Sequence, residues 1–110
     1  MDSHLIYAAA NSLKYKVTWL PVTPDSEWKT FKVENDSDND FLIKEITEYF
    51  GEFILYFVYT RSESYEIDMN EPGKLLRFIK INASFFLWNL KFKSVIEFNH
   101  IGVMRKGLIH

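Results

Sequence analysis

Residues 53–60 read FILYFVYT, the longest apolar stretch of the chain, and most of these residues are aromatic or β-branched. A strand with one exposed face alternates polar and apolar residues, whereas this stretch is apolar at both sets of alternate positions. The sequence therefore predicts a central β-strand that is covered on both sides. Residues 65–69 then alternate Tyr65, Ile67 and Met69 with acidic residues, which indicates a second strand that returns beside the first.

The segments after this hairpin predict more sheet. Residues 74–81, KLLRFIKI, fit the spacing of a helix or of a strand, and we favour the strand because several of its residues are β-formers. Residues 86–98 alternate apolar and polar side chains from Trp88 to Phe92, which predicts a half-buried strand. Residues 99–110 contain two glycines and are expected to form a loose edge or tail.

Two helices are predicted before the central strand. Residues 41–50, FLIKEITEYF, carry an apolar stripe at helical spacing, with Asp40 as the expected N-cap and a glycine directly after the last residue. Residues 2–13 predict a short helix that Asp2 or Ser3 can cap. Both segments therefore have a start signal and one apolar side that can pack on a sheet.

The remaining segments complete an α+β fold. Alternation in residues 15–19 and 28–33 predicts two strands of a long hairpin, and the acidic stretch 34–40 predicts a loop. We expect one domain over residues 1–110, with a mainly antiparallel sheet of about five or six strands and one or two helices packed on one face. A chain of 110 residues has room for one modest core.

The sequence contains no cysteine, which excludes disulfides, thiolate metal sites and thiol nucleophiles. It contains neither a glycine-rich phosphate loop nor a nucleophile motif, and its histidines, His4, His100 and His110, are scattered. Residues 36–40 are acidic, but the glycine and glutamate that an EF-hand calcium loop requires are missing from their positions. We therefore expect a protein that is not an enzyme, with no catalytic residues, no metal ligands and no cofactor.

The start of the chain and its longest apolar run bear on location. Asp2 stands where a signal peptide carries positive charge, and the run is far shorter than the roughly 18 residues that a membrane helix needs. We expect a soluble, cytoplasmic protein that does not bind membranes.

The net charge of −2 hides a strong asymmetry along the chain. Residues 1–40 carry a net charge of −3, residues 41–72 carry −5, and residues 73–110 carry +6. Either the acidic and basic segments neutralise each other within the fold, or one charged face binds a partner of opposite charge.

A negative surface would attract a basic protein and raise the rate of association. The leading hypothesis is a small protein-binding module, in kind like inhibitors or immunity proteins that block a basic partner such as a toxin nuclease. The acidic residues expected to form its binding patch are Glu34, Asp36, Asp38, Asp40, Glu66 and Asp68.

The alternative is a domain that binds single-stranded nucleic acid. Basic residues are interleaved with aromatic ones in the last third of the chain, and such surfaces pair phosphates with charges and stack bases on rings. The residues expected to bind nucleic acid are Arg77, Lys80, Lys91 and Lys93. A third hypothesis is a homo-oligomer that buries surplus aromatic residues between its subunits.

Overall fold

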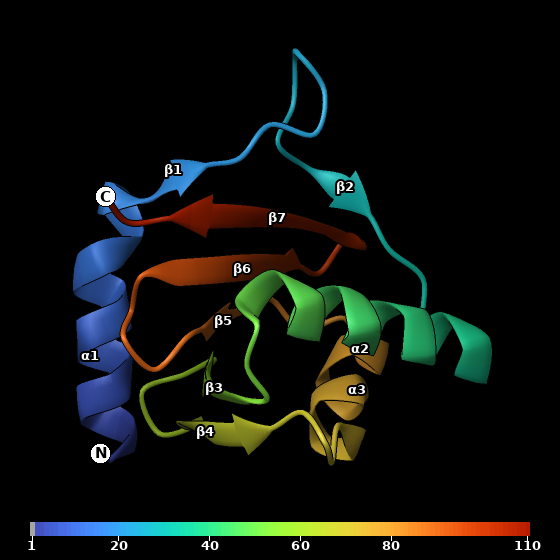
Figure 1. Ribbon diagram of the computed structural model, residues 1–110. Helices are drawn as coiled ribbons and strands as arrows, with labels where there is room; N and C mark the ends of the chain where they lie inside the picture. The colour runs from blue at the N-terminus through green and yellow to red at the C-terminus, as the bar shows by residue number, and fades with distance from the viewer. Residues whose placement is uncertain (1) are drawn as a thin grey trace.

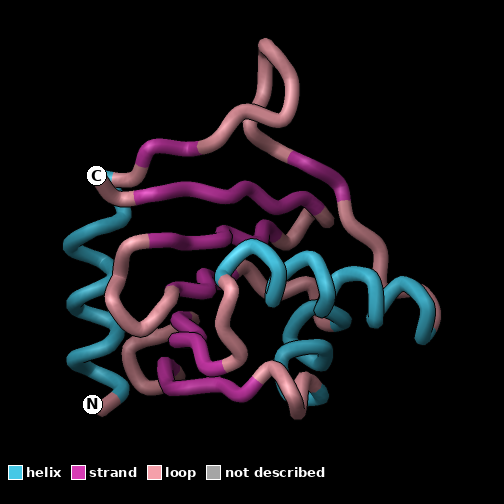
Figure 2. The backbone as a smooth tube through the Cα atoms, in the orientation of Figure 1, coloured by secondary structure: helices cyan, strands magenta, loops and turns pink. Residues whose placement is uncertain are grey.

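Strand β3 (Ile54–Val58) lies inside the sheet, between β4 (Ser64–Asp68) and β5 (Phe85–Trp88), and is antiparallel to both. Four of its five residues are buried, so the apolar stretch forms the central strand that its sequence predicts. The computed structural model describes residues 2–110, and Figure 1 and Figure 2 show the whole chain as one sheet with helices around it.

The sheet has seven strands in the order β1-β7-β6-β5-β3-β4, and β2 also pairs with β7. The other strands are β1 (Thr18–Trp19), β2 (Lys29–Thr30), β6 (Ser94–Asn99) and β7 (Val103–Leu108). The helices are α1 (Ser3–Leu13), α2 (Asp36–Phe50) and α3 (Gly73–Lys80), with a short 3₁₀ helix, η1 (Lys14–Lys16), after α1. Every strand pairing is antiparallel, and the α+β class is confirmed.

Helices cover both faces of the sheet. On the face that we call the α2 face, residues of α2 and α3 pack over a buried cluster that includes Leu55 and Phe57 of β3. On the opposite α1 face, Ile6 and Ala10 of α1 pack with Tyr56 and Val58 of the same strand. The expectation placed the helices on one face. The structure has a third helix and uses the second face as well, because successive residues of an apolar central strand need cover on opposite sides.

Residues 74–81 form helix α3 and not the predicted strand. Leu75 and Ile79, four residues apart, are both buried on the α2 face, while Arg77 and Lys80 are exposed. This spacing is the helical period, so burial of one helical stripe outweighs the strand preference of single residues.

Residues 86–98 form two strands and not one. β5 and β6 are joined by a turn at residues 89–93, in which the Asn89 side-chain oxygen accepts hydrogen bonds from the backbone N–H groups of Lys93 and Ser94. Phe92 has a φ of 55° in this turn, and its ring stacks on Tyr56 at 5.1 Å between centroids. The apparent strand alternation therefore includes turn residues that fold back onto the α1 face.

The segment expected to be a loose tail contains β7, an inner strand of the sheet. It pairs with β6 along its whole length, and on its other side it pairs with β1 and then with β2. β1 and β2 therefore do not pair with each other as the predicted hairpin. They lie end to end along β7, and residues 20–28 leave the sheet between them (Figure 1).

Helix α2 starts earlier than predicted. Its N-cap is Asn35, whose side-chain oxygen accepts a hydrogen bond from Asp38 N at 2.8 Å, so the acidic stretch is largely the first turns of the helix and Asp40 lies within it. The predicted end is confirmed, since Gly51 follows with a left-handed φ of 67°. The start of α1 is confirmed too, because Asp2 accepts a hydrogen bond from Leu5 N.

Within residues 2–110, no helix combines the length and the apolar character needed to cross a membrane.

We predict that Gly107→Ala destabilises the fold. A Cβ at Gly107 would lie 2.9 Å from Cε3 of Trp19 and still closer to Val17, because both side chains pack against the backbone of β7. Relieving this overlap should lower the free energy of unfolding by about 1–3 kcal/mol, the usual cost of overpacking. Urea unfolding followed by circular dichroism measures the change.

The matched control is Gly73→Ala at the start of α3, where a Cβ meets no atom within 4 Å. This change should alter the free energy of unfolding by less than about 1 kcal/mol and in the stabilising direction. Equal losses from the two substitutions would contradict the close packing of β1 on β7.

Candidate functional site

Four of the six predicted acidic residues gather at the start of α2. Glu34 precedes the helix, and Asp36, Asp38 and Asp40 lie in its first turns. Asp38 has a structural role, because its carboxylate accepts a hydrogen bond from Glu34 N at 3.2 Å while its backbone N–H donates to the N-cap oxygen of Asn35. The carboxylates of the other three form no ion pair within residues 2–110, and these residues are exposed.

Glu66 and Asp68 are not part of this cluster. Both belong to β4, and Glu66 pairs directly with Tyr56, whose side chain packs on the α1 face. Alternation along the strand gives Asp68 the same side as Glu66. Since α2 covers the opposite face, the structure divides the predicted acidic patch in two.

An exposed aromatic residue accompanies the acidic start of α2. Phe41 is 68% exposed, although its neighbour Leu42 is fully buried against the sheet. A hollow of about 280 Å³ lies between α2 and β2 at this point, and its lining includes Phe41, Asp38 and Lys32. The sequence pattern predicts Phe41 to lie in the helix and gives no sign of a binding surface there.

The four basic residues proposed for nucleic acid also fall into two groups. Arg77 and Lys80 lie on α3, which packs on the α2 face. Lys91 and Lys93 lie in the turn between β5 and β6, whose Phe92 packs on the α1 face. The structure does not bring these two pairs together into one basic surface.

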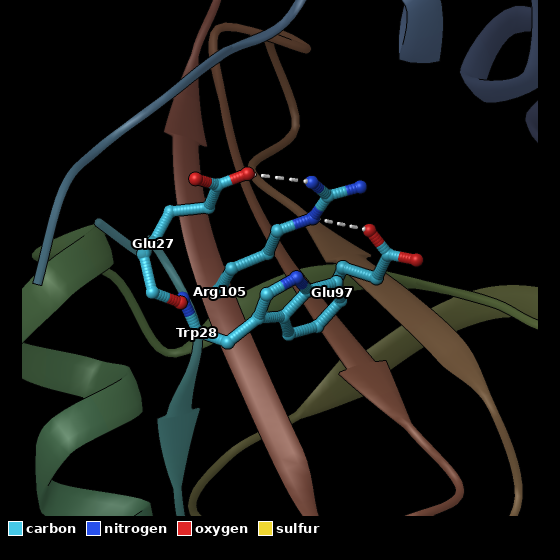
Figure 3. Close-up of polar contacts among 5 residues, drawn as sticks. Glu27, Trp28, Glu97 and Arg105 are labelled. Carbon is cyan, nitrogen blue, oxygen red and sulfur yellow. Dashed lines mark hydrogen bonds and ion pairs between the residues drawn. The ribbon is translucent and has the colours of Figure 1, made fainter.

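Arg105 of β7 forms a cluster that the sequence analysis missed. Its Nε donates a hydrogen bond to Glu97 Oε1 at 2.7 Å, and another guanidinium nitrogen donates to Glu27 Oε1 at 3.1 Å. The guanidinium carbon lies 3.8 Å from the ring centre of Trp19 and 4.5 Å from that of Trp28. Figure 3 shows the Arg105 side chain reaching between Glu27 and Glu97, with Trp28 beside it.

This cluster holds both ends of the loop formed by residues 20–28. Trp19 is the last residue of β1, and Trp28 directly precedes β2, so one arginine contacts the residues on either side of the departure from the sheet. Arginine suits this position because its planar group stacks on aromatic rings while its forked N–H groups bind carboxylates. The two tryptophans around a proline-containing loop were the signal available in the sequence.

A second ionic cluster joins β7 to α2 on the other face. Lys29 Nζ and Lys106 Nζ both donate to Glu45 Oε2 at 2.8 Å, and Tyr49 Oη donates to Gly107 O at 2.7 Å. Burial alone would raise the pKa of Glu45, but the hydrogen bonds and positive charges of Lys106 and Lys29 outweigh it, so this pKa is lower than usual. Burial raises the pKa of the Tyr49 hydroxyl.

These clusters account for part of the charge asymmetry. Arg105 and Lys106 belong to the basic last third of the chain, and they pair with Glu27 and Glu45 from the two acidic segments. Ion pairs within the fold therefore neutralise these two basic residues. Within residues 2–110, the carboxylates at the start of α2 have no ion pair of this kind.

The histidines do not converge. His4 is exposed on α1. His100 lies in the turn after β6, where its backbone N–H donates a hydrogen bond to Ser84 Oγ and its ring Nδ1 lies 3.2 Å from the same oxygen. Within residues 2–110, no carboxylate orients this imidazole, and no group of three metal-binding side chains gathers at one place. The Ser84–His100 contact ties two neighbouring turns together.

Comparisons with protein-family models, with curated proteins and with solved structures found no match to this chain.

We predict that Arg105→Lys loosens residues 20–28 without unfolding the sheet. Lysine retains the charge but lacks the planar group that stacks on both indole rings. Hydrogen bonds to charged groups contribute roughly 1.5–3 kcal/mol each, so their weakening should speed amide hydrogen exchange in the loop by about tenfold or more. Exchange measured by mass spectrometry tests this.

Arg77→Lys is the matched control, because Arg77 is exposed on α3 and makes no ion pair within residues 2–110. The control should leave exchange in the loop unchanged. Unchanged exchange in the Arg105→Lys variant would show that other contacts hold the loop.

We also predict an acid-sensitive contribution from Glu45. Its pKa in the folded protein lies below the ordinary value of 4.5, so its ionised form adds stability above about pH 4.5 that is lost as the pH falls through the folded value. The stability difference between the wild type and Glu45→Gln should therefore be constant near neutral pH and should shrink below about pH 4.5. Urea unfolding at a series of pH values measures it.

Glu48→Gln provides the comparison. Glu48 Oε1 lies 3.9 Å from Lys44 Nζ on the exposed side of α2. Surface ion pairs of this kind contribute at most about 0.5 kcal/mol to the free energy of unfolding. If the two glutamine variants gave the same pH profile, Glu45 would not be the acid-sensitive group.

Proposed function

We propose that this protein is a non-enzymatic protein-binding module of the inhibitor or immunity type, which covers a basic surface of a partner with the acidic start of α2. The observation that supports this most directly is the exposed side chain of Phe41 at the same end of α2 as the unpaired carboxylates of Asp36 and Asp40. Covering such a ring with a partner would remove apolar surface from water and so favour association.

The carboxylates would supply the attraction to a basic partner. Asp36 and Asp40 are exposed, and Glu34 lies just before the helix, so their negative charges combine over one end of α2. Like-signed charges on one surface raise association rates with an oppositely charged protein and make those rates depend on salt. This end of the helix also benefits from acidic residues, which complement the helix dipole. That benefit accounts for the residues nearest the start, whereas Asp40 lies beyond the first turn.

Phe41 would supply the apolar contact. Aromatic residues that become fully buried at an interface contribute much of its binding energy, and charged neighbours at the rim contribute mainly rate and specificity. Bound to a partner, Phe41 would lose its exposed surface while the hollow beside it, of about 280 Å³, would accept a side chain of the partner. A protein partner fits this surface better than single-stranded nucleic acid, because the candidate basic residues lie in two separate groups.

The first test is capture from a lysate of the native host by the tagged chain, with nuclease-treated and untreated samples compared by mass spectrometry. We expect one stoichiometric basic protein in both samples. Its association with purified wild type, Asp36→Asn/Asp40→Asn and Phe41→Ala should then be measured at two salt concentrations. The double variant should associate about tenfold more slowly at low salt and with a weaker salt dependence, and Phe41→Ala should dissociate at least tenfold faster.

The control removes the same number of charges elsewhere, as Glu66→Gln/Asp68→Gln on β4, and should change association by less than about twofold. The asparagine variants keep Asn35 and Asp38, so the N-cap and the hydrogen bond from Glu34 N to the Asp38 carboxylate are both retained. Equal effects of the two double variants would refute the role of α2. Loss of every captured protein after nuclease treatment would favour the nucleic-acid alternative.

A further inference from the structure

Residues 20–28 form a loop that projects from the edge of the sheet, as Figure 1 shows above β7. Its residues 21–25 are all exposed, and Val22 is 53% exposed. A cavity of about 350 Å³ lies under the loop, lined by loop residues together with Tyr49 and residues of β7. The loop therefore stands away from the body of the protein and adds little to its core.

The loop is nevertheless held in one shape. Val22 N and Thr23 N each donate to Ser26 O at 2.9 Å, and Ser26 N donates back to Thr23 O, which closes a tight turn with Pro24 inside it. Proline suits that position because its φ is already set for the turn. Outside the turn, Leu20 N donates to Lys106 O, and Arg105 contacts the tryptophans at both ends.

This arrangement interrupts the edge strand at a single position of β7. Leu20 N still donates to Lys106 O and Lys29 pairs with Met104, so residues 21–28 leave the sheet opposite Arg105 alone. Rigid loops that project from a sheet carry recognition more often than stability. A loop ordered before binding also loses less entropy when it binds.

We infer that residues 20–28 insert into a concave site of the partner protein, in the manner of an inhibitory loop. The turn presents Pro24 and the carboxylate of Asp25, and the apolar side chain of Val22 lies just before it, where it also lines the hollow under the loop; all three residues are exposed. The site that receives it would have an apolar floor and a basic side chain near its entrance, which fits the basic partner of the proposed function. This inference rests on that proposed function and names the segment that reaches the partner's cleft.

The loop and the acidic start of α2 can contact one partner together. They follow each other along the same edge of the molecule, joined by β2 (Figure 1). The chain from Pro24, in the turn of the loop, to Asp36 can span at most about 42 Å, and the molecule is 34 Å in its longest direction. A standard interface buries about 800 Å² on each partner, an area roughly 30 Å across, so a partner that covers this whole side can contact both features.

Site-specific photo-crosslinking in the host lysate tests the inference. Val22, Phe41 and Leu5 are each replaced by p-benzoylphenylalanine in separate tagged proteins, and crosslinked products are identified by mass spectrometry. Position 22 lies beside the turn of the loop, position 41 lies in the second turn of α2, and Leu5 is a control that is 58% exposed on α1. We expect positions 22 and 41 to label the same single protein and position 5 to leave it unlabelled.

The loop and the helix give separable results. Labelling from position 41 without labelling from position 22 would overturn the loop inference and leave the proposed function standing. Labelling of one protein from position 22 without labelling from position 41 would support the loop and refute the role of α2. If position 22 labels no protein, or only the same mixture as position 5, the loop inference fails.

The clamp at the base of the loop gives a further check. Adding Arg105→Lys to the position 22 protein should lower its crosslinking yield at least fivefold, because a mobile loop binds less tightly. The same change in the position 41 protein should alter the yield by less than twofold. Equal yields from position 22 with and without the substitution would show that the loop does not need to be ordered in advance.

Discussion

Three consecutive residues of β7 hold the two halves of the chain together, each by a different kind of contact. Arg105 forms one ion pair with Glu27 of the loop and contacts the indole rings of Trp19 and Trp28 at the two ends of the loop. Lys106 faces the other way and binds Glu45 of α2. Gly107 leaves the space in which Val17 and Trp19 lie against the strand, and its carbonyl accepts a hydrogen bond from Tyr49. Strand alternation makes this possible, because neighbouring residues of one strand reach opposite faces of the sheet.

The position of β7 also explains how the charge of the chain is organised. The basic residues that follow Pro72 reach the acidic first part of the chain through this strand, since Glu27 and Arg105 are 78 residues apart in sequence yet bonded in the fold. The carboxylates near β7 form ion pairs with its basic residues. The carboxylates at the start of α2 and on β4 form no such pair in the part of the chain that the structure describes, so they make up the exposed acidic surface.

The sequence was most informative where structure depends on neighbouring residues. Local signals predict the strand in residues 53–60, the cap of α1 by Asp2 and the end of α2 at Gly51. The structure confirms the cap and the end of α2, and it confirms the central strand with shorter bounds, at Ile54–Val58. The acidic cluster at residues 34–40 could be found because its members are adjacent in sequence. The segment that forms helix α3 was ambiguous, because an apolar pattern over eight residues fits the helical period and the strand period equally well. Only the position of the sheet face on which it packs decides between them.

Contacts between distant segments could not be predicted in the same way. Nothing near Arg105 indicates that it meets Trp19 and Trp28, and nothing near Gly107 indicates a neighbouring tryptophan. The glycines and basic residues of this segment are typical of a loose end, so an inner strand was mistaken for a tail. Glu66 and Asp68 were grouped with Asp36 by charge alone, although strand register gives them the opposite face.

The place of β7 in the chain has a consequence for the way the protein folds during synthesis. β7 is the last of the strands to be made, yet it fills the position between β6 and the first two strands. Until it emerges from the ribosome, β1 and β2 have no strand to pair with and β6 presents an open edge. Pairing over almost the whole chain is slow, because a large loop must close before its contacts form. The growing chain therefore exposes tryptophans and an unpaired strand edge until β7 is made, and such surfaces favour aggregation.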